Sequence, residues 1–207
     1  MCPATSMARV VIPIYFDYAS TLCYVAWRIV SELRRELEFE PLWKGVPIRW
    51  RSHASRPGNA LGKIERAKIA TVVAETGVQV IPPDCWLDSK AALMGSESAR
   101  RAGVFEPFHD GIFRGAFELG LDISNPDRLV EIAAAAGMDG EAFRQDIQSR
   151  LTLSCLMENK SEADRFSALG YPTFMLGEFP LIGIQPKETM RLLLDRFLNQ
   201  RHRAPQG

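Results

Sequence analysis

The stretch FDYASTLCYVAW, residues 16–27, changes from a strand-like pattern to a helix-like pattern within a few positions. Residues 9–18 are rich in β-branched and aromatic types, which predicts a buried strand. Either Ser20 or Thr21 supplies an N-cap, and apolar side chains then recur at helical spacing over residues 21–37. The sequence therefore predicts a strand that leads directly into a helix.

The remaining chain predicts an α/β fold whose two halves lie far apart in sequence. Residues 39–46 resemble a second strand, so the chain opens as β-α-β. Helical patterns then dominate, and we predict helices at residues 63–75, 89–102, 107–119, 126–136 and 141–169. Short apolar runs return at residues 171–176 and 179–184, and a helix over residues 186–199 follows them. The two halves form one sheet only if the helical block is an insertion between them.

Composition and charge exclude several classes of function. The chain has 207 residues, of which 46% are hydrophobic, and its 25 basic and 25 acidic residues cancel. This balance gives no long-range attraction to nucleic acid or to an anionic membrane. No apolar run approaches the ~20 residues that span a bilayer, and the start lacks a secretory pattern, which together predict a cytoplasmic protein. The four cysteines form no CxxC pair, so we expect neither a metal site nor structural disulfides.

Two places in the sequence could carry chemistry. The N–H groups at a helix N-terminus are unpaired and the helix dipole adds positive charge, so a thiolate is stabilised there. Ser20 and Cys23 are three positions apart and should point to one side of the first turn. The second place is Tyr171-Pro172, where a proline opens a strand and a cis peptide bond is affordable. The backbone of Tyr171 would then be open to an extended peptide or a thiol.

Together with GYPTF at residues 170–174, this pattern resembles the DsbA family of thioredoxin-fold proteins. Within the family it is most similar to FrnE-like oxidoreductases, 2-hydroxychromene-2-carboxylate isomerases and kappa-class glutathione transferases, and the similarity covers about residues 10–198. It implies a discontinuous thioredoxin-like domain of residues 9–62 and 170–200 around an all-helical insertion domain of residues 63–169. It also implies a groove between the opening helix and the proline loop, and a homodimer by analogy alone.

The sequence departs from the dithiol members of this family at the site itself. Those members carry CxxC, whereas this chain has Ser20-Thr21-Leu22-Cys23, so the attacking sulfur is missing. A lone Cys23 cannot run a dithiol–disulfide cycle within one site. A serine at the first position resembles the glutathione-using branch, which implies that the Ser20 hydroxyl hydrogen-bonds the glutathione sulfur and favours its thiolate. We therefore predict Ser20 and Cys23 as the catalytic residues.

Further residues are predicted to bind the thiol, and glutathione is the expected exogenous thiol. The predicted thiol-binding residues are Tyr171, Pro172, Thr173, Arg56, Lys63 and Gln185. Arg56 or Lys63 could meet the glutathione carboxylates. Gln185 stands where the resemblance leads one to expect a carboxylate that holds the γ-glutamyl end, which counts against glutathione binding.

Three functions are consistent with the sequence. The leading hypothesis is a DsbA-like oxidoreductase that uses an exogenous thiol such as glutathione. The first alternative is a glutathione-dependent isomerase or transferase that acts on an aromatic electrophile, and the second is a non-catalytic binding module. Simpler roles also stay open for single residues: Ser20 as an N-cap only, Cys23 as a small core residue, Asp17 as a helix-start contact, and Cys85 as an incidental thiol.

Overall fold

A four-stranded sheet joins the two ends of the chain. The computed structural model describes residues 9–48, 56–168 and 170–203. Its strands are β1 (Val10–Phe16), β2 (Phe39–Gly45), β3 (Thr173–Leu176) and β4 (Phe179–Ile182). Their order is β2-β1-β3-β4, with β1 parallel to β2 and antiparallel to β3. The β-α-β and β-β-α halves therefore share one sheet, which confirms the predicted fold.

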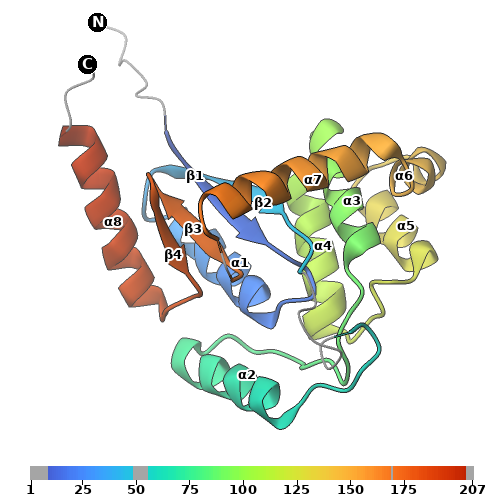
Figure 1. Cartoon of the computed structure of the whole chain (residues 1–207), viewed down its shortest axis with the longest axis horizontal. Helices are drawn as coiled ribbons and strands as arrows, with labels where there is room; N and C mark the ends of the chain where they lie inside the picture. The colour runs from blue at the N-terminus through green and yellow to red at the C-terminus, as the bar shows by residue number, and fades with distance from the viewer. Residues whose placement is uncertain (1–8, 49–55, 169, 204–207) are drawn as a thin grey trace, which may run out of the picture.

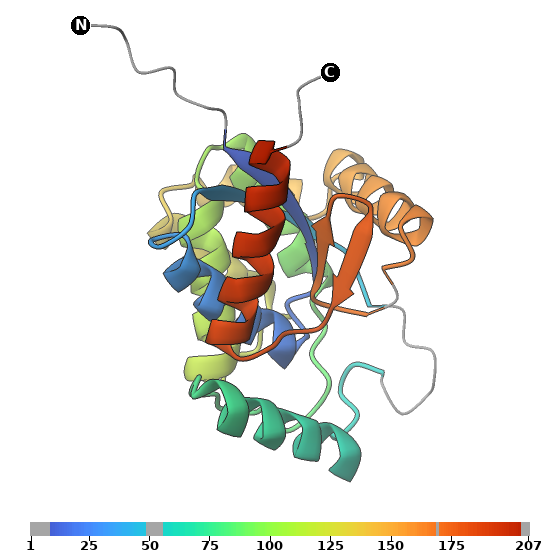
Figure 2. The same ribbon diagram turned by 90° about the vertical axis from the view of Figure 1, so that its left-hand side faces the viewer.

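Helices flank the sheet and form a separate block beside it (Figure 1). The helices are α1 (Thr21–Leu33), α2 (Lys63–Thr76), α3 (Lys90–Arg101), α4 (Phe105–Glu118), α5 (Pro126–Ala135), α6 (Gly140–Asp146), α7 (Arg150–Arg165) and α8 (Lys187–Arg203). Helices α1 and α8 contact each other beside the sheet, and α3 to α7 gather on the other side of the molecule. Helix α2 lies below the sheet, where it contacts α1, and Figure 2 shows it from the side.

The first face of the sheet is covered by α1 and α8. Alternate residues of β1, namely Ile12, Ile14 and Phe16, are fully buried in the main core, as a pleated strand requires. Helix α1 buries most of its residues there, and α8 adds Met190 and Leu194 from one helical face. This packing holds α1 against the sheet, and three residues of the junction between β1 and α1, Asp17, Tyr18 and Ala19, are buried.

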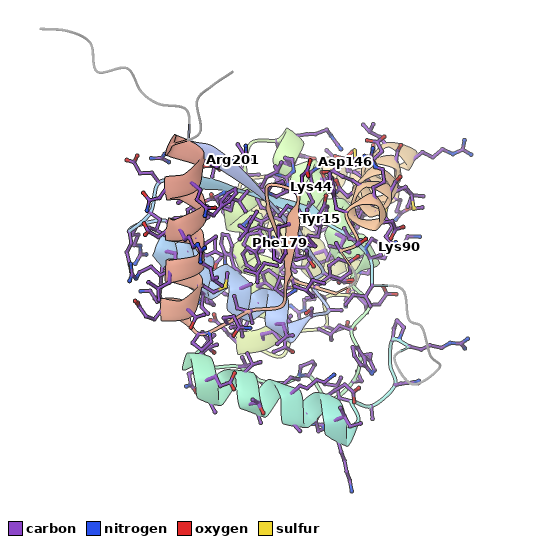
Figure 3. All side chains as sticks on the ribbon, turned by 60° about the vertical axis from the view of Figure 1, so that its left-hand side comes forward. Tyr15, Lys44, Lys90, Asp146, Phe179 and Arg201 are labelled. Carbon is purple, nitrogen blue, oxygen red and sulfur yellow. The ribbon has the colours of Figure 1, made fainter. Side chains whose placement is uncertain are left out.

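The second face of the sheet is covered by α7. Tyr15 points to this face, where it is buried beside Met175, and its hydroxyl donates a 2.9 Å hydrogen bond to Glu162 of α7. Lys44 of β2 forms an ion pair with the same carboxylate. Figure 3 labels Tyr15 and Lys44, which lie close together over the sheet. These contacts hold the end of α7 near the loop that precedes β3.

The prediction of a single helix over residues 141–169 is wrong. The structure has two helices there, because Ser149 is extended, with φ −77° and ψ 150°, and acts as the N-cap of α7. Its side chain accepts a hydrogen bond from the N–H of Thr152, and the Thr152 hydroxyl donates to the Asp146 carbonyl at the end of α6. Serine favours this capped conformation over a helix interior, so a new helix begins at this position.

Candidate functional site

The first turn of α1 begins at Ser20, directly after β1. Ser20 is extended, with φ −96° and ψ 114°, and its side chain accepts a hydrogen bond from the N–H of Cys23 at 3.3 Å. The Ser20 N–H donates to the Asp17 carbonyl at 3.0 Å, which closes the turn between strand and helix. The Ser20 hydroxyl also donates toward the carbonyl oxygen of Tyr171, 3.5 Å away. The N-cap serine thus faces the loop before β3.

That loop is held in place from both of its ends. The peptide bond between Tyr171 and Pro172 is cis. The hydroxyl of the buried Thr173 donates to the Gly170 carbonyl, and the Pro172 carbonyl accepts a 2.7 Å hydrogen bond from Gly183, just after β4. These bonds leave the Tyr171 carbonyl directed toward the start of α1.

A cleft of about 660 Å³ opens beside Ser20 and Tyr171. Its lining comes from several segments, among them Ala19 to Leu22 at the start of α1, Glu65, Lys68 and Ile69 on α2, Pro83, Cys85 and Trp86 after α2, and Lys160 and Asp164 on α7. The cleft has the size of a small-molecule site, with apolar walls and a few polar groups. The helical segment that follows β2 therefore contributes a wall of the site.

The structure brings some of the predicted site residues together and leaves others apart. Ser20 and Tyr171 both line the cleft, and Pro172 and Thr173 directly follow Tyr171 in the chain. Arg56, Lys63 and Gln185 are exposed and are not among the described residues that line this cleft. Any role of these three in binding a thiol stays a prediction.

Cys23 lies one turn inside the helix and has no access to the cleft. Its side chain is fully buried in the core, and this burial raises the pKa of its thiol to about 12, against the opposing effect of a hydrogen bond with Ser20. A thiol with such a pKa is protonated at neutral pH and is a poor nucleophile. The burial favours the alternative that Cys23 is a small core residue, and its catalytic role stays a prediction.

Several lining residues were not identified from the sequence. On α2, Glu65, Lys68 and Ile69 share one helix face at i, i+3, i+4 spacing, but two of the three are charged, so no apolar stripe marks this face in the sequence. Cys85 lies opposite Ala60 in an isolated antiparallel bridge, and it is partly exposed. No local pattern marks Cys85, because the bridge forms only in the folded chain.

Metal binding and membrane insertion find no support in the described residues. Within residues 9–48, 56–168 and 170–203, no group of three or more His, Cys, Asp or Glu side chains is placed to hold a metal ion. None of the helices described combines the length and apolar character needed to cross a bilayer.

A thioredoxin-type sheet, a helix capped by Ser20 and a facing proline loop define the class of this protein. The family model of the DSBA-like thioredoxin domain matches residues 11–195. The chain therefore belongs to the DsbA-like thioredoxin family. Solved structures with a similar fold include a probable oxidoreductase and an isomerase.

Similar proteins include both kinds of enzyme. The uncharacterized protein YwbO of Bacillus subtilis is 23% identical over 190 residues, which cover 86% of this chain and 92% of YwbO. A probable DsbA oxidoreductase of Streptomyces coelicolor has a TM-score of 0.76 at 21% identity, covering 96% of this chain and 93% of that one. A 2-hydroxychromene-2-carboxylate isomerase has a TM-score of 0.73 at 17% identity, and the match covers 93% of this chain and 98% of the isomerase. The cytosolic disulfide reductase DsbM of Pseudomonas aeruginosa, solved with glutathione, has a TM-score of 0.69 at 17% identity, and the match covers 92% of this chain and 100% of DsbM.

Proposed function

We propose that this protein is a thiol-handling oxidoreductase that binds an exogenous thiol such as glutathione in the cleft, with the thiol sulfur beside Ser20. The observation that carries the proposal is the Ser20 hydroxyl at the start of α1, which lines the cleft and faces the Tyr171 carbonyl. The similarity of fold to DsbM, which was solved with glutathione, supports the same proposal.

The start of α1 supplies the groups that stabilise a thiolate. At 3.5 Å the hydrogen bond from Ser20 to Tyr171 is long for an O–H···O contact, so the hydroxyl can turn to a sulfur at little cost. The N–H groups of Thr21 and Leu22 belong to the first turn, where a helix offers them no acceptor, and both residues line the cleft. These donors and the helix dipole favour the charged form of a bound thiol and lower its pKa.

The proposed reaction is thiol–disulfide exchange with two molecules of the thiol. The bound thiolate attacks one sulfur of a substrate disulfide, forms a mixed disulfide, and releases the other sulfur as a thiolate that takes up a proton. A second glutathione attacks the mixed disulfide at the glutathione sulfur, which releases the second substrate thiol and oxidised glutathione. Two glutathione molecules lose two electrons in total, and the substrate disulfide gains them. No protein sulfur is required, so Cys23 takes no part.

A second candidate is a glutathione-dependent isomerase or transferase that acts on an aromatic electrophile. The observation that favours it is the apolar wall beside Ser20, where Leu22, Ile69 and Trp86 line the cleft and could hold an aromatic ring. The same thiolate would then add to carbon rather than to sulfur. The fold is also similar to that of the 2-hydroxychromene-2-carboxylate isomerase.

Glutathione as co-substrate points to a reducing compartment such as the cytoplasm, and DsbM is described as cytosolic. We place the reaction there. The homodimer implied by family analogy stays a prediction.

The test is a calorimetric titration of the protein with glutathione, followed by two activity assays. We expect saturable binding and glutathione-dependent reduction of insulin disulfides. Turnover of a chromene-type substrate without insulin reduction would favour the isomerase or transferase. If neither glutathione binding nor activity in either assay is found, the proposal fails and a non-catalytic module is the better description.

A further inference from the structure

Asp17, the residue that directly follows β1, makes an unusual set of contacts. Its carboxylate is fully buried. One oxygen accepts hydrogen bonds from the Ala19 N–H at 2.8 Å and from the Ser89 hydroxyl. The other oxygen accepts from the Ile48 N–H at 2.6 Å. A single side chain thus binds three separate segments of the chain.

Each of the three segments leads into a wall of the cleft. Ala19 and Ile48 line the cleft themselves, and Ala19 directly precedes Ser20. Ser89 is the residue before α3 and follows Trp86, another lining residue, by three positions. The Asp17 carboxylate is therefore the common attachment point of three walls that come from distant parts of the sequence.

A buried carboxylate is a costly way to join three segments. Burial raises the pKa of Asp17, while the hydrogen bonds from Ala19, Ser89 and Ile48 oppose this effect. Among the described residues its hydrogen-bond donors are two backbone N–H groups and one hydroxyl, and these hydrogen bonds offset part of the cost of burial. An asparagine at position 17 could not replace both carboxylate oxygens as hydrogen-bond acceptors, because its side-chain NH₂ group would face an N–H or O–H donor.

We propose that Asp17 is a positioning residue of the site, whose carboxylate holds the Ser20 turn, the Ile48 segment and the Cys85–Trp86 wall at the separation that a small thiol requires. The residue touches neither the thiol nor the substrate. The inference deepens the proposed function, but the arrangement of the walls can be measured without any thiol substrate.

The test uses two cysteines of the same molecule as reporters. Cys85 lines the cleft, whereas Cys155 lies on α7, is also partly exposed and is not among the lining residues described. We would label the protein with 5,5′-dithiobis(2-nitrobenzoate) and measure the rate at each cysteine by peptide mass spectrometry. Asp17→Asn should raise the ratio of the Cys85 rate to the Cys155 rate about tenfold. This is the factor by which the loss of one buried hydrogen bond would favour opening of the wall that carries Cys85.

A matched control is Asp139→Asn. Asp139 also accepts a backbone hydrogen bond, from Ala142 at the start of α6, but it lies outside the lining of the cleft. This variant should leave the labelling ratio unchanged. Ser89→Ala removes one donor, keeps the carboxylate, and should raise the ratio about threefold, so the proposal is tested even if Asp17→Asn does not fold.

Two outcomes would overturn the proposal. One is an unchanged ratio in both Asp17→Asn and Ser89→Ala, and the other is an equal rise at Cys85 and Cys155, which would mean a general loosening of the fold. Kinetics supply a second readout, because a misplaced wall should raise the KM for glutathione while kcat changes less than KM. If the wild-type protein binds no glutathione, the proposed function fails, but the labelling ratio still decides the role of Asp17.

Discussion

The hydroxyl oxygen of Ser20 lies 3.5 Å from the carbonyl oxygen of Tyr171, although the two residues are 151 positions apart in the chain. They meet because β1 pairs antiparallel with β3, with Tyr15 opposite Thr173. The residues that follow β1 and those that precede β3 therefore lie at the same end of the sheet. The contact is long enough that the hydroxyl can exchange the carbonyl for another acceptor. This relationship places a hydrogen-bond donor at the mouth of a cleft.

Replacing Ser20 by alanine should impair the reaction more than it impairs stability. A hydrogen bond to a charged acceptor contributes about 1.5–3 kcal/mol, so Ser20→Ala should slow glutathione-dependent insulin reduction by about 10- to 100-fold. It should also raise the pKa of the bound glutathione thiol, which can be followed by thiolate absorbance during a pH titration. Loss of the N-cap alone costs about 1 kcal/mol of unfolding free energy.

Ser149→Ala is the matched control for Ser20→Ala. Ser149 caps α7 through a hydrogen bond from Thr152, as Ser20 caps α1, but it is not among the described residues of the cleft. A similar loss of stability with normal turnover is expected for this control. Normal turnover in Ser20→Ala itself would remove the chemical role of the serine and leave it an N-cap.

Cys23 should be inert and replaceable. Because burial raises the pKa of the Cys23 thiol to about 12, the thiol stays protonated at pH 8. Iodoacetamide at pH 8 should therefore modify Cys85 and leave Cys23 unmodified, as peptide mass spectrometry would show. Cys23→Ala should cost about 1–2 kcal/mol of stability through a small cavity and leave kcat/KM within about twofold. A large loss of activity in a stable Cys23→Ala protein would restore the catalytic role predicted from the sequence.

The sequence predicts one half of the site better than the other. The start of α1 and the loop at Tyr171 are set by local signals, namely a cap residue before an apolar helix and a proline before a strand. The resemblance to the DsbA family implies that these two places face each other across a groove, and the antiparallel pairing of β1 with β3 brings them together.

The opposite wall of the cleft could not be predicted in this way. Helix α2 buries only Ile69, so it has no apolar stripe that shows which face turns inward. The position of Cys85 depends on its bridge to Ala60, and the role of Asp17 depends on Ile48 and Ser89, which come from distant segments. Such contacts leave no period in the sequence, so no local pattern points to Lys68, Cys85 or Asp17 as residues of this wall.

His109 should make stability depend on pH. Its side chain is fully buried among aromatic rings, its Nδ1 atom shares a 2.8 Å hydrogen bond with the Tyr18 hydroxyl, and burial lowers its pKa well below 6.5. The unfolded chain then binds a proton below pH 6.5 that the folded chain excludes. Stability from this group is fully present above pH 6.5 and falls as the pH falls, by about 1.4 kcal/mol between pH 7.5 and 5.5.

Urea unfolding at pH 7.5 and 5.5 would measure this dependence in the wild-type protein and in His109→Phe. The variant loses the hydrogen bond to Tyr18 at both pH values, so only the difference between the two pH values isolates the titration. Asp17 and the other titrating groups are common to both proteins and cancel in that difference. An identical pH dependence in the two proteins would mean that His109 is protonated or accessible in the folded state.

Gly95 should be the position in the helical block that is most sensitive to a single added methyl group. A Cβ atom at Gly95 would lie 2.7 Å from Cζ of Phe143 and 2.9 Å from Cζ of Phe108, so α3 approaches α6 and α4 too closely for any larger residue. We expect Gly95→Ala to cost about 1–3 kcal/mol of unfolding free energy, the usual cost of overpacking.

At Gly115 on α4 the nearest side-chain atom would lie 3.5 Å from the new Cβ, so Gly115→Ala should be neutral or stabilising by up to about 1 kcal/mol. Urea denaturation of the two variants compares them directly, and a Gly95→Ala protein as stable as Gly115→Ala would mean that α3, α4 and α6 do not pack in this way. Because neither glycine lines the cleft, both variants should keep the wild-type affinity for glutathione, which separates the stability of the helical block from the chemistry at Ser20.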